Sequence, residues 1–72
     1  MTQEEKIMDY MERHGSITPL EAMEEFGIMR LGARIYDLKE SGVKIITETV
    51  TSKNREGKPV RFARYRLERG NA

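Results

Sequence analysis

The chain has no cysteine and only one histidine among its 72 residues. Without cysteine it forms no disulfide and offers no thiolate to a metal ion, which fits a reducing cytoplasm. The lone His14 has no cysteine or assignable serine partner, and the sequence shows no glycine-rich phosphate loop and no zinc or calcium spacing. We therefore expect a protein that is not an enzyme and that uses no metal and no cofactor.

Long hydrophobic runs are also missing. No stretch approaches the roughly 20 apolar residues that span a bilayer, and the acidic amino terminus has no signal-peptide core. With 38% hydrophobic and 35% charged residues, we expect a thin core under a strongly solvated surface. The sequence predicts a cytoplasmic protein with no membrane partner, one domain over residues 1–69 and a disordered tail over residues 70–72.

Charge is abundant, and it is unevenly distributed. Residues 1–29 hold seven acidic and two basic side chains, a net charge of −5, whereas residues 30–72 hold eleven basic and five acidic side chains, a net charge of +6. A concentrated cationic surface on a small domain attracts anionic partners, nucleic acid first among them.

Three helices are predicted in the first part of the chain. The pairs Thr2/Glu5 and Thr18/Glu21 both fit a capping box, so helices should begin after each threonine. The first helix carries the apolar stripe Ile7, Tyr10, Met11 and His14, and the second gathers Ala22, Met23 and Phe26 on one side. The third opens at residues 28–30, runs to about residue 41 and buries Leu31, Ile35 and Leu38. We expect most methionines to fill the core, with Met29 exposed at the turn.

A β-hairpin is predicted after Gly42. Residues 44–53 are rich in β-branched side chains, residues 59–68 alternate apolar and basic side chains, and the polar residues 54–58 lie between them. Side chains alternate along a strand, so the length of the loop decides which residues share a face. An odd-length loop puts Ile45, Thr47 and Thr49 on the same inward face as Ala63, Tyr65 and Leu67. Pro59 begins the second strand, where its missing N–H costs least.

This order of elements, with four short segments, resembles a winged helix-turn-helix domain. The segments are residues 15–18 (GSIT), 26–28 (FGI), 34–38 (RIYDL) and 64–67 (RYRL), and they are similar to small helix-turn-helix proteins encoded by phages and prophages. The similarity covers about residues 3–68. It implies an α+β fold of three helices followed by a hairpin wing, a short strand at Ser16-Ile17, and double-stranded DNA binding as the default function.

Two surfaces are candidates for contact with DNA. Helix three would enter the major groove with Arg30, Ala33, Arg34 and Asp37 near base edges, although Arg34 is equally suited to an internal ion pair with Asp37. The wing would hold phosphates through its basic residues, although charge also protects exposed strands from aggregation. The wing candidates are Lys44, Lys53, Arg55, Lys58, Arg61 and Arg64.

Other functions remain open at the level of sequence. The acids Glu21, Glu24 and Glu25 share a face of the second helix and suit either solvent or a basic partner, which would make the chain a protein-interaction adaptor. Structured RNA is a further alternative partner. Because one small module makes limited contact with DNA, we expect a homodimer, tandem sites or a larger assembly with phage or host proteins.

Overall fold

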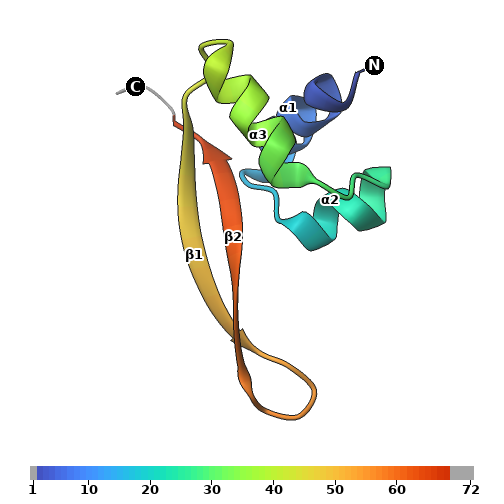
Figure 1. The fold of residues 1–72 in the computed structure, drawn as a ribbon, viewed down its shortest axis with the longest axis vertical. Coiled ribbons are helices and arrows are strands. Elements are labelled where there is room, and N and C mark those ends of the chain that lie inside the picture. The colour runs from blue at the N-terminus through green and yellow to red at the C-terminus, as the bar shows by residue number, and fades with distance from the viewer. Residues whose placement is uncertain (1, 69–72) are drawn as a thin grey trace.

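The computed structural model describes residues 2–68 and places three helices at one end of an antiparallel hairpin (Figure 1). The elements are α1 (Gln3–His14), α2 (Pro19–Phe26), α3 (Leu31–Glu40), β1 (Ile45–Lys53) and β2 (Pro59–Leu67). The predicted α+β order of three helices and a two-stranded hairpin is confirmed. The tail predicted over residues 70–72 lies outside the described residues.

The first two helices begin at the predicted capping boxes. The N–H of Glu5 donates to Thr2 Oγ1 at 3.1 Å and the N–H of Thr2 donates to Glu5 Oε1 at 2.8 Å; Thr18 and Glu21 repeat the arrangement at 3.2 and 2.9 Å. The backbone and side-chain hydrogen bonds with Thr2 hold the pKa of Glu5 below its ordinary value of 4.5. Gly15 ends α1 with a φ of 89°, a left-handed conformation that glycine adopts without steric cost.

The third helix begins later than predicted. Leu31 is its first residue and Arg30 is the N-cap, with a φ of −124°, a ψ of 64° and no side-chain capping bond. Ile28 lies before the helix in the turn, where its side chain is buried and its N–H donates to the carbonyl of Ala22 at 3.2 Å. Burial of the Ile28 side chain and this hydrogen bond hold the turn in place. The apolar residue at position 28 therefore belongs to the turn and is not the first residue of the helix.

The core combines one face of each helix with the turn and the short strand. Its buried residues are Ile7, Met11, Ile17, Ala22, Ile28, Leu31, Ile35 and Leu38. The predicted stripe of α1 is wrong at His14, which is exposed and lies against Tyr10 with ring centroids 4.3 Å apart. The methionine prediction is wrong at Met23, which is 43% exposed, whereas Met29 is exposed as predicted, at 77%.

The hairpin, residues 45–67, is called the wing from here on. Its register pairs Ile45 with Leu67 and Thr47 with Tyr65, which confirms the odd-length loop. The predicted short strand is a single bridge: Ile17 and Tyr65 exchange backbone hydrogen bonds of 2.8 and 2.9 Å. This bridge attaches β2 to the helices.

The wing extends well beyond the helices (Figure 1). For this reason the predicted inward face is only partly right. Ile45, Tyr65 and Leu67 pack against the core at the base of the wing, whereas Thr47 and Thr49 are exposed. Among residues 2–68, no helix has the length and apolar character to cross a membrane.

Candidate nucleic-acid interface

Four basic side chains surround the far end of the wing. These tip cations are Lys53, Arg55, Lys58 and Arg61, and all four are exposed. None of them forms an ion pair with an acidic side chain in the described part of the chain. Their charges are therefore free to meet an external anion without first breaking an internal contact.

The side chain of Asn54 shapes the loop that carries two of these cations. Its Oδ1 accepts hydrogen bonds from the backbone N–H groups of Glu56 at 2.9 Å and Lys58 at 3.0 Å. The backbone N–H of Asn54 also donates to the carbonyl of Lys58 at 2.9 Å. A side-chain amide that bonds local backbone in this way fixes a turn. The loop therefore presents Arg55 and Lys58 on an ordered backbone.

One side of the wing is free of acidic residues. Side chains alternate along a strand, so Thr47, Thr49, Thr51, Lys53 and Arg61 lie on the side that packs against the helices at the base of the wing. We call this side the threonine face. It joins α3 directly, because Lys39 Nζ donates to Thr47 Oγ1 at 3.3 Å. Hydroxyl and cationic groups in one row suit contact with phosphate oxygens.

The opposite side of the wing carries a partly neutralised charge cluster. The carboxylate of Glu48 forms ion pairs with Arg64 and Arg66, and each arginine Nε lies 3.4 Å from a carboxylate oxygen. Arg64, predicted as a DNA contact, is therefore engaged within the sheet and half-buried. The two arginines share one carboxylate, so this side keeps less free positive charge than the tip.

The residues in and beside α3 that were predicted to contact DNA differ in their surroundings. Arg30 is exposed at the N-cap and Ala33 is half-buried near the outward side. Arg34 faces α1, where Nη1 lies 3.5 Å from Glu4 Oε1, and its Nη2 lies 3.1 Å from Asp37 Oδ2. The Arg34–Asp37 ion pair is the internal pairing that the helix spacing allowed. Lys44, the last candidate, is exposed just before β1.

Two further residues of α3 lie on the side nearer the wing. Tyr36 is 62% exposed, and Lys39 bonds to the threonine face. They follow Gly32 at helical spacing, and Gly32 lies near the Tyr65 hydroxyl of β2. Sequence reasoning left Tyr36 and Lys39 out of the candidates. An exposed aromatic three residues before a lysine was the available signal, but the sequence did not tell which side of α3 faces the wing.

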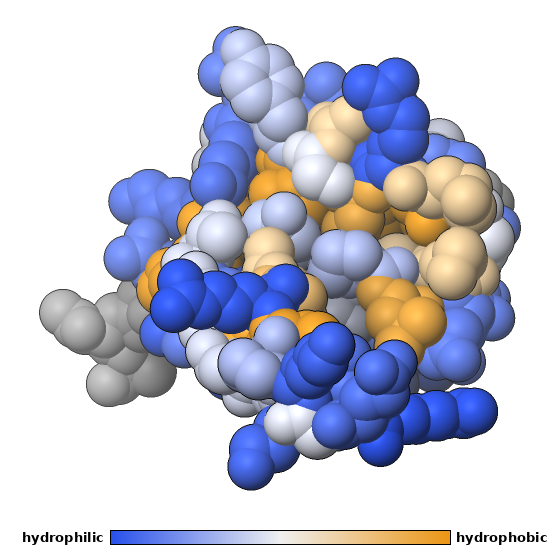
Figure 2. Space-filling view, turned by 60° about the horizontal axis from the view of Figure 1, so that its bottom comes forward, coloured by the Kyte–Doolittle hydropathy of each residue, from blue (hydrophilic) through white to orange (hydrophobic). Residues whose placement is uncertain are grey.

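Seen from the end toward which the wing projects, hydrophilic side chains cluster beside exposed hydrophobic surface (Figure 2). Within residues 2–68, no group of three or more histidine, aspartate or glutamate side chains is arranged to hold a metal ion. The arrangement of cations, hydroxyls and an exposed helix is suited to binding an extended polyanion.

A comparison with protein families agrees with this geometry. The model described as a winged helix-turn-helix domain matches residues 2–70. No curated protein matches the chain. The match spans every helix and strand described above.

Proposed function

We propose that this chain, which belongs to the winged helix-turn-helix domain family, binds double-stranded DNA as a module without enzymatic activity. The observation that carries the proposal is the row of threonine hydroxyls and tip cations, which Lys39 joins to α3 and in which no cation forms an ion pair within residues 2–68. Domains of this kind place a helix in the major groove and contact the backbone from beside it. Here α3 would enter the groove and the wing would follow the phosphates.

The two parts of the surface would have different roles. The tip cations and the threonine hydroxyls would contact phosphates, which positions the protein without reading sequence. Ala33 and Tyr36 on α3, with Arg30 at its start, would lie nearest the base edges. Arg34 and Asp37 would contribute to reading bases only after leaving their mutual ion pair, and Arg34 would also have to leave Glu4 of α1.

The biological setting is also a proposal. The resemblance to small phage and prophage helix-turn-helix proteins suggests a regulator of phage or prophage genes, or a component of excision or packaging, acting in the cytoplasm. DNA binding is common to all of these roles, so it is the property to test first.

The test is a titration of random-sequence duplex DNA at a series of salt concentrations, followed by fluorescence anisotropy. Wild-type protein should bind with an affinity that falls steeply with salt, because each phosphate contact releases a counterion. Removing two tip cations, with Arg55→Ala and Lys58→Ala together, should lower the slope of log affinity against log salt by about 2.

Arg13→Ala is the matched control, because Arg13 is an exposed α1 arginine that pairs with Asp9. It should leave the slope unchanged. Salt-insensitive binding, or the same slope for the tip variant and wild type, would overturn the proposal. Tighter binding to duplex RNA of matched sequence would favour the RNA alternative instead.

A further inference from the structure

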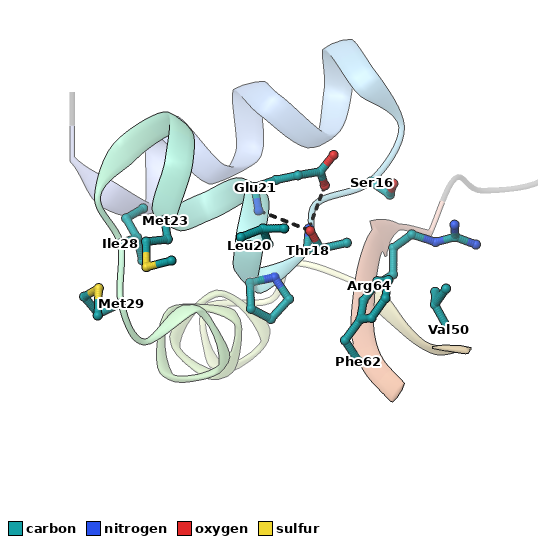
Figure 3. A pocket seen from close by; sticks show the side chains of 11 residues that line it. Ser16, Thr18, Leu20, Glu21, Met23, Ile28, Met29, Val50, Phe62 and Arg64 are labelled. Atoms are coloured by element: carbon teal, nitrogen blue, oxygen red, sulfur yellow. Dashed lines mark hydrogen bonds between the residues drawn. The ribbon is translucent and has the colours of Figure 1, made fainter. Parts of the chain in front are cut away.

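An apolar groove lies between α2 and the wing (Figure 3). It has a volume of about 700 Å³, and Leu20 and Met23 line it from α2 while Val50 and Phe62 line it from the wing. Of the six large hydrophobic side chains that are exposed among residues 2–68, four line this groove: Leu20, Met23, Met29 and Phe62. Exposed apolar side chains gathered in one place, and not scattered, mark an interaction surface.

The groove uses the side of the wing opposite the threonine face. Val50 pairs directly with Phe62, and both alternate with the threonine positions along their strands. Val60, two residues before Phe62 on the same side of β2, is 37% exposed and continues the apolar strip toward the tip. A partner seated in the groove would therefore leave the threonine face uncovered.

Opposite charges border the groove. On the α2 side, Glu24 lies one helical turn after Leu20 and is exposed. Among the described residues, Glu24 and Glu25 form no ion pair. On the wing side, Arg64 lines the groove, and because Arg64 and Arg66 share the single carboxylate of Glu48, this side carries a surplus positive charge. The groove thus has an acidic border and a basic border on one chain.

We infer that a second copy of this chain occupies the groove, in a two-fold symmetric dimer. In such an interface each copy offers the same patch, so α2 of one copy faces the wing of the other, and the reverse. The acidic border of each copy then lies against the basic border of its partner, and the apolar strips are buried between them. This inference does not rest on DNA binding, and its test contains no DNA.

The charge arrangement allows a reciprocal test by sedimentation equilibrium. Glu24→Lys makes both borders basic and Arg64→Glu makes both acidic, so each variant alone should raise the dimer dissociation constant roughly tenfold or more. An equimolar mixture of the two variants should restore dimers, because each border then meets its opposite. Glu12→Lys, an equal charge change on an exposed α1 residue that is not among those lining the groove, should leave the dissociation constant unchanged.

The apolar contribution is tested separately with Leu20→Gln and Met29→Gln. These side chains are 59% and 77% exposed, so each variant should keep the melting temperature that wild-type protein has when it is diluted to monomer, while dimer formation is lost. Wild-type protein that stays monomeric at all concentrations, or a variant mixture that forms no heterodimer, would overturn the inference. DNA binding measured with monomer remains an independent test of the proposed function.

Discussion

Gly32 differs from the glycines that end helices, because it lies inside α3 and its φ is not positive. A methyl group added at Gly32 would lie 3.7 Å from the Tyr65 hydroxyl oxygen, an ordinary van der Waals distance. At Gly15 the surrounding space is open, but the φ of 89° is one that side chains disfavour. Space and backbone conformation therefore predict opposite effects of the same substitution at these two positions.

Gly32→Ala should stabilise the protein by about 0.5–1 kcal/mol, because alanine loses less conformational entropy than glycine within a helix. For a domain of this size the melting temperature should rise by roughly 2–8 °C. Gly15→Ala should instead destabilise by ~1 kcal/mol or more, since alanine disfavours a positive φ. Thermal unfolding followed by circular dichroism measures both. A Gly32→Ala protein that melts below wild type would mean that the Tyr65 contact is tighter than 3.7 Å.

For Arg34, the sequence predicted one of the two acidic partners that the structure shows. Helix spacing pointed to Asp37 as a partner, and the structure contains that ion pair. The second partner, Glu4, lies thirty positions earlier in the chain. No local pattern specifies which side of α3 packs toward α1, so the spacing alone did not separate an internal contact from an external one.

At the scale of elements, the wing is predicted in detail because several local signals agree. Loop length fixed the register, Pro59 marked the start of β2, and Ile17 fell where the bridge to Tyr65 forms. The sequence did not specify how far the wing extends past the helices. Alternation gives the two faces of a strand, but only the packed structure shows which positions of the inward face the helices cover, and Thr47 and Thr49 stay exposed.

The tip loop offers a test of order without any change in charge. Asn54→Ala removes the acceptor of two backbone hydrogen bonds while every tip cation remains. The loop should become less ordered, and DNA affinity should fall about two- to fivefold, equivalent to roughly 0.5–1 kcal/mol for bonds of this kind. The dependence of affinity on salt should keep its wild-type slope, because the number of phosphate contacts is the same.

Titration of duplex DNA, together with NMR relaxation of the loop amides, measures both effects. Asn54→Asp retains an acceptor at the same position and serves as the geometric control for loop order, although its added negative charge excludes it from the comparison of affinities. Unchanged loop relaxation in Asn54→Ala would contradict the role given to this side chain.

At the scale of the whole molecule, the small core limits the free energy of unfolding, so the loss of a single buried residue is a large fraction of it. In the part of the chain that the structure describes, eight buried hydrophobic residues form the core, and a domain of this size rarely gains more than about 3–5 kcal/mol from its core. Ile17 is fully buried and also carries the backbone bridge to β2. Loss of packing at this residue therefore affects the helices and the attachment of the wing together.

Ile17→Ala should cost about 2–5 kcal/mol, enough to leave much of the protein unfolded at room temperature. A ligand that binds only the folded state offsets such a loss, and at a hundred times its dissociation constant it contributes about 2.7 kcal/mol. Duplex DNA at low salt should therefore restore the dispersed methyl NMR signals of Ile17→Ala. The same variant carrying Arg55→Ala and Lys58→Ala should recover less at equal DNA concentration, because its phosphate contacts are fewer. Recovery that is equal with and without the tip cations would show that DNA stabilises the fold through some surface other than the wing.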